Sequence, residues 1–253
     1  MDDIEARILT NENIIKDYFL LRLKLSKPLG KVVPGQFVML KIPKSSVFLR
    51  RPFSIYAYRR GVMTIMYKLK GKGTMDLAKA IKGDITYVLG PLGKGFHIKT
   101  SGENLVVAGG IGIAGVHMLL ERLKNRACLF FGCADHKEVV LTERLYLKGI
   151  HISTLDGSFG FKGNITDMLR GYLENHNNIQ DIQVYACGPE GMIKSLRDVL
   201  EKDRIPCQVL LEERMACGLG LCFGCVKRTL DEKEPYKRVC REGPVFHIWQ
   251  ICL

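Results

Sequence analysis

Four cysteines near the C-terminus have a spacing that suits an inorganic cofactor. Cys217, Cys222, Cys225 and Cys240 follow the pattern C-x4-C-x2-C, and the fourth cysteine comes after a gap of fourteen residues. Three thiolates in one loop and a fourth from a later strand are typical of plant-type [2Fe-2S] clusters. The glycines between the first three can adopt positive φ and let backbone amides approach the sulfur atoms. The spacing therefore predicts a cluster bound by these four residues.

Zinc and disulfides are the alternatives for the same cysteines. A structural zinc site usually has two C-x2-C knuckles, which the four-residue gap and the lone fourth cysteine fit poorly. Nine cysteines are an odd number, and the sequence predicts no signal peptide. Both features favour a reduced, cytoplasmic protein over a disulfide framework.

Two features in the first third of the chain could bind phosphate. Arg51-Pro52-Phe53-Ser54 carries a guanidinium and a hydroxyl three residues apart, and such a pair can hold a diphosphate. Gly71-Lys72-Gly73-Thr74 is a glycine turn ahead of a short helix predicted at 75–81, with Thr74 as the N-cap. A surface arginine and an ordinary helix cap are the alternative. Together the two features favour one phosphate-bearing cofactor.

A glycine motif marks the start of a second domain. Gly110, Gly112 and Gly115 satisfy G-x-G-x-x-G between an apolar strand at 105–108 and an amphipathic helix that continues to Leu123. Strand, glycine turn and helix in this order are the context that a dinucleotide-binding motif requires. We therefore predict a dinucleotide at this turn.

Further candidate residues follow later strands of the same domain. Cys187, Gly188 and Pro189 stand where a parallel strand ends and a helix begins, although a small buried cysteine would look the same. Asp135 lies about twenty residues beyond Gly115, where a carboxylate can accept from a ribose 2'-hydroxyl, or it is an ordinary loop residue. The glycine-rich loop 156–164 could close over a ligand.

The elements that must position these residues form two architectures. Short apolar segments separated by turns predict strands at 6–10, 17–26, 36–42, 53–58 and 62–69, hence an antiparallel β-barrel. Strands at 105–108, 128–132, 150–154 and 183–187 alternate with helices, as in a doubly wound parallel α/β domain. The predicted divisions are 1–96, 97–208 and a cluster-binding segment at 209–253.

Composition limits the classes of function. The chain has 253 residues, 47% of them apolar, and its longest apolar runs are too short to span a bilayer. Its formal net charge is +12, but lysine and arginine are scattered instead of forming a block. Neither nucleic-acid nor membrane binding is expected.

The two phosphate-binding features come first, the glycine motif and the Cys187 segment follow, and the four cysteines come last. In this order of motifs the chain resembles the ferredoxin-NADP reductase superfamily. The stretches L-E-E-R-M-A-C-G at 211–218 and V-C-R-E-G-P-V-F at 239–246 are similar to the electron-transfer subunits of NAD-linked, class 1B dihydroorotate dehydrogenases. The resemblance covers essentially the whole chain, and its C-terminal part is the most specific.

This resemblance implies a subunit that carries FAD and a [2Fe-2S] cluster and reduces NAD+. Its partner would be a separate FMN-containing catalytic subunit that oxidises dihydroorotate, in a heterotetramer of two copies of each. Cys187 would face the nicotinamide, and Phe53 departs from the tyrosine common in relatives. The implied flavin contacts are Arg51, Pro52, Phe53, Ser54, Met66, Tyr67, Lys68, Gly73 and Thr74.

Two other functions fit parts of the sequence. One is an iron-sulfur flavoprotein subunit that serves another partner, such as a transhydrogenase or a glutamate-synthase-like enzyme. The other is a binding module that holds a cluster for sensing or scaffolding, without turnover and without flavin.

Overall fold

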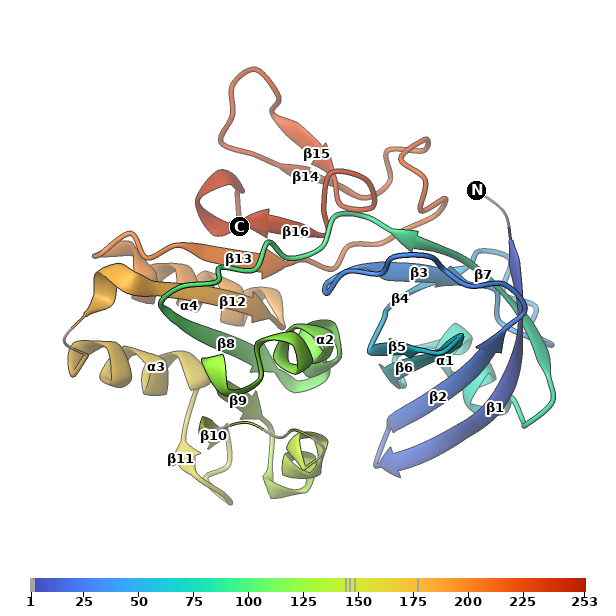
Figure 1. Ribbon diagram of the computed structural model, residues 1–253, viewed down its shortest axis with the longest axis horizontal. Coiled ribbons are helices and arrows are strands. Elements are labelled where there is room, and N and C mark those ends of the chain that lie inside the picture. Colours follow the sequence, from blue (N-terminus) through green and yellow to red (C-terminus); the bar gives the residue numbers. More distant parts are fainter. Residues whose placement is uncertain (1–2, 144, 146, 148, 177) are drawn as a thin grey trace.

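The computed structural model describes residues 3–143, 145, 147, 149–176 and 178–253. Within these residues the chain forms a seven-stranded antiparallel sheet, a second seven-stranded sheet that is mostly parallel, and a two-stranded hairpin (Figure 1). The antiparallel sheet belongs to the N-terminal part and the mostly parallel sheet to the remainder. The chain thus has the predicted order of a β-barrel followed by an α/β domain.

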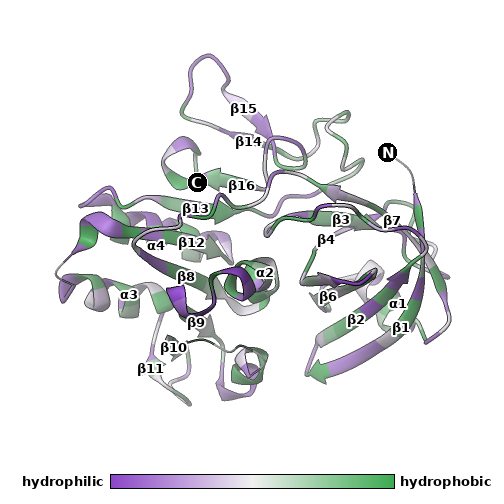
Figure 2. Ribbon diagram, viewed as in Figure 1, coloured by the Kyte–Doolittle hydropathy of each residue, from purple (hydrophilic) through white to green (hydrophobic). Residues whose placement is uncertain are grey.

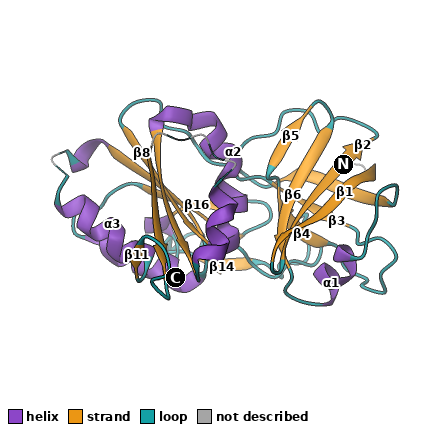
Figure 3. Ribbon diagram, turned by 90° about the horizontal axis from the view of Figure 1, so that it is seen from below, coloured by secondary structure: helices purple, strands orange, loops and turns teal. Residues whose placement is uncertain are grey.

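The N-terminal sheet has the strand order β4-β3-β7-β1-β2-β6-β5. It curls into an open barrel, so that β4 at one end contacts β6 near the other (Figure 3). Leu21 and Leu23 of β2 point into the barrel core, whereas Tyr18 and Leu20 pack against the second domain. The strands are β1 (Ile4–Ile15), β2 (Tyr18–Leu25), β3 (Phe37–Leu40), β4 (Arg51–Ser54), β5 (Ala57–Arg59), β6 (Val62–Lys68) and β7 (Ile85–Leu92).

Several local predictions for the barrel need correction. The segment 53–58 forms parts of two strands, β4 and β5, and β7 was not predicted. The helix is α1 (Lys72–Ala78), which begins earlier than expected. Gly71 is its N-cap, and Thr74 is instead the third helical residue. The Thr74 hydroxyl still serves the turn, because it accepts from the Gly71 amide at 3.2 Å and donates to the Gly71 carbonyl at 2.9 Å.

The second sheet has the order β11-β10-β9-β8-β12-β13-β16, and only β16 among its described strands runs antiparallel. Its helices are α2 (Ile113–Leu123), α3 (Ile165–Glu174) and α4 (Glu190–Glu201). Core residues place α2 on one face and α3 with α4 on the other. The strands are β8 (Glu103–Gly109), β9 (Ala127–Cys133), β10 (Gly149–Thr154), β11 (Phe161–Lys162), β12 (Ile182–Cys187), β13 (Cys207–Leu210) and β16 (Val245–His247).

The C-terminal segment rests on both domains. Its last strand, β16, adds to the edge of the parallel sheet beside β13, and the Trp249 indole donates to the Ile205 carbonyl at 3.1 Å. On the other side the amide of Lys94 donates to the carbonyl of Gly243. The predicted division between residues 208 and 209 falls inside β13, so the segment is continuous with the nucleotide-binding sheet. That division stays a prediction.

A hairpin of β14 (Val226–Arg228) and β15 (Tyr236–Arg238) extends from this segment. Figure 2 shows that the hairpin is largely hydrophilic, whereas β13 and β16 beneath it are hydrophobic. Among the described residues, no helix is long and apolar enough to cross a membrane.

Candidate functional site

A cavity of about 870 Å³ lies between the barrel, the carboxyl ends of β8, β9 and β12, and the segment that follows β13. In this doubly wound sheet the strand order reverses between the parallel strands β8 and β12, and ligands bind at such a position. The cavity wall brings together predicted residues from both domains. They are Pro52, Phe53, Ser54, Met66, Tyr67, Lys68, Thr74, Gly110 and Pro189.

Arg51 and Gly73, predicted from two separate motifs, are in contact beside the cavity. A Cβ atom added to Gly73 would lie 3.0 Å from Nε of Arg51. The Arg51 side chain therefore lies against the backbone of Gly73, and a larger residue at position 73 would collide with it. Nη1 of Arg51 donates to the carbonyl of Leu49 at 2.8 Å, which fixes the direction of the guanidinium. The two expected phosphate-binding features therefore form a single region, as one phosphate-bearing cofactor requires.

The Tyr67 ring points into the barrel. Its hydroxyl donates to Oδ1 of Asn11 at 3.0 Å, and the ring packs 5.4 Å from Phe19 and 5.9 Å from Phe53, measured between centroids. Burial raises the pKa of Tyr67. The main chain of Tyr67 is therefore the part that can face a flavin, while the Met66 side chain on the other face of β6 packs toward the second domain.

The glycines of the G-x-G-x-x-G motif bring α2 against the end of β12. A Cβ atom at Gly112 would lie 2.1 Å from the Cys187 carbonyl oxygen, and one at Gly115 would lie 2.9 Å from the Cys187 sulfur. Gly110 has a φ of +50°, and its Cα faces the Tyr18 hydroxyl. Two of the three glycines thus permit close packing, and the first lines the cavity.

Cys187 itself is buried, with 2% of its surface exposed. Its sulfur packs against Gly115 and burial raises the pKa of the thiol, with a further contribution from the charge of Glu212. The cavity wall in this region includes Gly110, Pro189 and Leu210. The expected contact between Cys187 and a nicotinamide stays a prediction, and Gly188 packs beside it against Met192.

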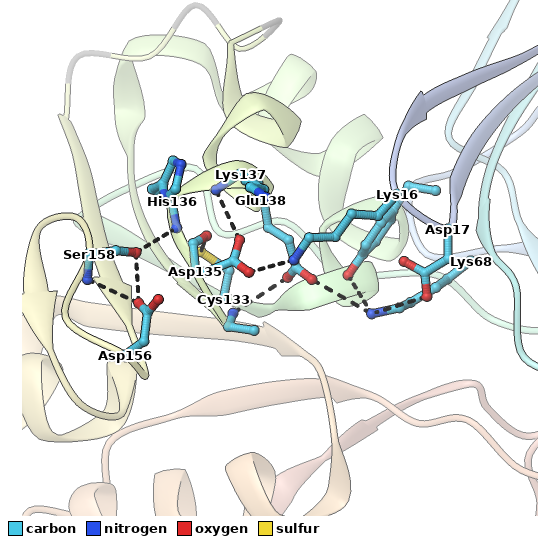
Figure 4. A network of polar contacts seen from close by, with 12 residues as sticks. Lys16, Asp17, Lys68, Cys133, Asp135, His136, Lys137, Glu138, Asp156 and Ser158 are labelled. Carbon is cyan, nitrogen blue, oxygen red and sulfur yellow. Dashed lines mark hydrogen bonds and ion pairs between the residues drawn. The ribbon is translucent and has the colours of Figure 1, made fainter.

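Asp135 lies two residues beyond β9, where it was expected, but its carboxylate is paired. The Lys16 ammonium, from the barrel, contacts Oδ2 of Asp135, and the Lys137 amide donates to Oδ1 at 3.0 Å (Figure 4). The Lys16 hydrogen bond is the largest cause that holds the pKa of Asp135 below its usual value. Asp135 is thus half of an ion pair with the barrel, which the sequence did not predict.

The cavity wall also contains residues that sequence reasoning missed. The buried carboxylate of Glu138 and the Tyr18 side chain meet Lys68 there, and Glu212 and Met215 line the opposite side. No local motif marks Tyr18 or Glu138. The two residues come from different domains and meet only in the folded chain. Glu212 and Met215 lie in the stretch whose resemblance to a family was apparent, which was the available signal.

The loop 156–164 lies at the edge of this site and is tied to it. The Ser158 hydroxyl accepts from the His136 amide at 2.8 Å, so the loop is held against the turn that carries Asp135. Gly163 and Asn164 belong to the cavity wall. Closure of this loop over a ligand stays a prediction.

The four predicted cluster cysteines lie as two neighbouring pairs, Cys217 with Cys222 and Cys225 with Cys240. The Cys240 amide donates to Sγ of Cys225 at 3.4 Å. Cys222 is exposed, whereas Cys225 and Cys240 are buried. Gly218 and Gly220, between the first two cysteines, have φ values of +70° and +78°, as expected. Gly224, for which positive φ was also expected, does not have it, and the preceding residue, Phe223, has a φ of +55° instead.

Backbone amides point at these sulfur atoms. The amide of Leu219 donates to Cys217 Sγ at 3.3 Å, and the amide of Gly224 donates to Cys222 Sγ at 3.4 Å. Although burial alone raises the pKa of Cys217, such hydrogen bonds lower it to about 6. Burial, together with the neighbouring Cys225, raises the pKa of Cys240 to about 12. The loop thus favours the thiolate form of Cys217.

The pairwise arrangement of the cysteines can be compared with the ligand set of an iron-sulfur cluster. In a four-cysteine [2Fe-2S] cluster each of two irons takes two thiolates. Two thiol pairs with amides directed at the sulfurs therefore fit an iron-sulfur cluster, and the assignment of Cys217, Cys222, Cys225 and Cys240 as its ligands stays a prediction.

Comparison with solved structures defines the class. An NADH-dependent reduced ferredoxin-NADP oxidoreductase superposes with a TM-score of 0.85 at 24% identity, over 98% of this chain and 89% of that chain. A ferredoxin-NADP+ reductase from Neisseria gonorrhoeae superposes with a TM-score of 0.66 at 21% identity, over 78% and 90%. The fold is that of the ferredoxin reductases, with an added cluster-binding segment.

Sequence comparison is more specific. Residues 212–252 match the protein family described as the iron-sulfur cluster binding domain of dihydroorotate dehydrogenase B. The "Dihydroorotate dehydrogenase B (NAD(+)), electron transfer subunit" of Caldanaerobacter subterraneus subsp. tengcongensis is 37% identical over 96% of both chains, and its counterpart in Listeria welshimeri is 35% identical over 87% of both. The chain belongs to this family of electron transfer subunits.

Proposed function

We propose that this chain takes electrons from the FMN of a dihydroorotate dehydrogenase catalytic subunit and delivers them to NAD+, in pyrimidine biosynthesis. When bound, a [2Fe-2S] cluster carries single electrons and FAD carries pairs, so the two connect a one-electron route to hydride transfer. Residues of this chain would hold the cluster and FAD one after the other along the path of the electrons. Family membership supports this partner over the alternative of another enzyme, and the flavin-type cavity supports a redox subunit over a sensing module.

The observation that carries the proposal is the position of the cluster loop between the surface and the cavity. A Cβ atom at Gly218, next to Cys217, would lie 2.5 Å from Cγ of Met39 in β3. Two residues earlier in the same strand, Phe37 lines the cavity. Phe37 and Met39 point to the same face of β3, so the loop proposed to bind the cluster and the space proposed for the flavin are two residues apart along one strand, a short path for electrons.

The flavin and the nucleotide are proposed to share the cavity from opposite sides. Arg51 and Gly73 would hold the FAD diphosphate, and Ser54 with the main chain of Tyr67 would face the flavin ring. The nicotinamide would approach over Gly110 and Pro189, at the ends of β8 and β12. Such an arrangement places both rings between the two domains and away from bulk water.

The partner subunit is proposed to dock where the cluster loop reaches the surface. Leu219, Leu221 and Phe223 flank Cys222 and expose 37%, 72% and 60% of their surfaces. Exposed apolar side chains that are grouped together mark interaction sites. A partner bound here would cover the outer thiol pair and bring its FMN close to the cluster. We propose a heterotetramer with two copies of each subunit.

A cytoplasmic location is part of the proposal. All nine cysteines are free thiols, of which four are the proposed cluster ligands. Thiols and a cluster of this kind persist in a reducing compartment.

The test is to express the chain alone and together with its candidate partner. The isolated chain should oxidise NADH with an artificial acceptor, and only the pair should reduce NAD+ with dihydroorotate. An absorbance spectrum should show flavin bands superposed on broad iron-sulfur absorption. Turnover of dihydroorotate by the isolated chain, or a cluster without flavin, would contradict the proposal.

A further inference from the structure

Two ion pairs join the barrel to the nucleotide-binding domain beside the cavity. Lys16 contacts Asp135, and Lys68 Nζ lies 3.7 Å from Oε1 of Glu138. Both lysines come from the barrel, and both carboxylates come from the stretch just after β9 (Figure 4). One side of the nucleotide-binding domain is therefore completed by residues of the flavin-binding domain.

Lys16 is presented to Asp135 by the tip of a hairpin. It lies in the turn between β1 and β2 and has a positive φ of +46°. The side-chain amide of Asn13 donates to the Lys16 carbonyl at 2.8 Å and so braces the turn. The position of Lys16 is thus set by the turn as well as by its ion pair.

The second pair holds this hairpin against the other domain. Glu138 is 4% exposed, and its carboxylate also accepts from the amide of Ala134 at 3.5 Å. Lys68 in turn donates to the Tyr18 hydroxyl at 3.1 Å. Tyr18, Lys68, Ala134 and Glu138 all line the cavity, so the Lys16–Asp135 pair stands at the edge of the cavity wall.

The position of Asp135 indicates a chemical role for the ion pair between Lys16 and Asp135. A carboxylate just beyond the second strand of a doubly wound domain can accept from the ribose 2'-hydroxyl of NAD, and it repels the 2'-phosphate of NADP. Lys16 neutralises that carboxylate and offers a cation to a 2'-phosphate. We propose that Lys16 is a specificity-determining residue, which together with Asp135 sets the choice between a 2'-hydroxyl and a 2'-phosphate.

This inference rests on the proposed function, since it needs a nicotinamide nucleotide at this end of the sheet. It adds that residues of both domains determine the preference between NAD and NADP. A residue of the flavin-binding barrel reduces the discrimination that Asp135 would give alone. Removal of the lysine should therefore sharpen the preference for NAD, whereas removal of the aspartate should weaken it.

The test uses the full chain with its cofactors and two probes that do not react with flavin. Adenosine 5'-monophosphate and adenosine 2',5'-bisphosphate differ by the 2'-phosphate, and calorimetry gives a Kd for each. In Lys16→Met the ratio of the bisphosphate Kd to the monophosphate Kd should rise roughly five- to ten-fold, and in Asp135→Asn it should fall by a similar factor. The double variant should return the ratio to within about two-fold of the wild type.

Controls separate specificity from simple support of the fold. Lys16→Gln should reproduce the effect of Lys16→Met, and Lys16→Arg should keep the wild-type ratio. Lys44→Met removes a lysine that pairs with Asp84 elsewhere on the barrel and should change nothing. If Lys16 only joined the domains, both affinities would change equally; a constant ratio would overturn the inference.

A wild-type chain that binds neither probe would also overturn the inference, because the nucleotide would then lie elsewhere. Reduction of NAD+ by dihydroorotate in the complex reports separately on the proposed function. The two can therefore fail independently.

Discussion

The Nε atom of Arg51 lies 3.0 Å from the point where a Cβ atom of residue 73 would stand, so the arginine depends on the glycine opposite it. Arg51 belongs to β4, and Gly73 belongs to the first turn of α1. Together they define where a diphosphate can be held on the barrel. The contact leads to a prediction about flavin retention.

Arg51→Ala should weaken FAD binding by about 2 to 3 kcal/mol, because a forked, charge-assisted phosphate contact is lost. Gly73→Ala should cost less, on the order of 1 kcal/mol, because the new methyl group displaces the arginine by only a few tenths of an ångström. FAD fluorescence after dialysis measures both. The neighbouring Arg50→Ala, which removes a surface pair with Asp3, is the control and should keep its flavin. Iron content should stay constant in all three; joint loss of both cofactors would indicate misfolding.

Cys222→Ser should remove or destabilise the cluster, because one of two irons loses a thiolate. Cys128→Ser and Cys252→Ser are matched controls, since these thiols lie outside the two pairs. Iron and sulfide assays on the purified variants measure the outcome. Full loading of the Cys222 variant would refute the ligand assignment.

Leu221→Asp and Phe223→Asp should weaken the complex with the catalytic subunit, because each buries a charge in a docking surface. A loss on the order of 2 kcal/mol, or about thirty-fold in Kd, is expected for each variant. NADH oxidation by an artificial acceptor should persist, since the cavity is unchanged. Phe48→Asp is the control, because Phe48 is 96% exposed on the barrel and far along the chain from the cluster loop. Equal weakening by Phe48→Asp would place the partner elsewhere.

His117 should make the stability of the chain depend on pH. Its Nδ1 lies 3.0 Å from the Tyr56 carbonyl across the domain interface, and its ring stacks on that of Tyr56 with centroids 3.6 Å apart. Burial lowers the pKa of His117, with Glu121 opposing the shift. The unfolded chain therefore binds a proton more readily near pH 6.5 than the folded chain does. The contribution of His117 to the free energy of unfolding is fully present above that pH, and it is lost as the pH falls toward the pKa of His117 in the folded chain.

The free energy of unfolding should therefore fall by up to about 1.4 kcal/mol for each pH unit over this window. His117→Asn keeps a donor for the Tyr56 carbonyl and cannot titrate, so its stability should depend less on pH between 7.5 and 5.5. Chemical denaturation at each pH measures the difference. The exposed His97→Asn is the control. Identical slopes for the wild type and His117→Asn would contradict the prediction.

The sequence by itself determined the features that depend on residues close together in the chain. The spacing of Cys217, Cys222 and Cys225 sets the geometry of one loop, and Gly218 and Gly220 supply positive φ in its first half. Likewise, G-x-G-x-x-G between a strand and a helix is a local arrangement. Their order along the chain was enough to predict a ferredoxin reductase-like fold, because each domain of that fold is continuous in sequence up to the cluster-binding segment.

Only the tertiary structure decided which residues that are distant in the sequence come into contact. It paired Asp135 with Lys16, 119 positions earlier, and so changed an isolated carboxylate into half of an ion pair. It also placed the Cys187 thiol against Gly115, a contact that the position of Cys187 at a strand end did not specify. β16 joined the nucleotide-binding sheet from a segment predicted to be separate. Such contacts follow from how the two domains pack, and packing depends on the shapes of whole surfaces that no short stretch of sequence specifies.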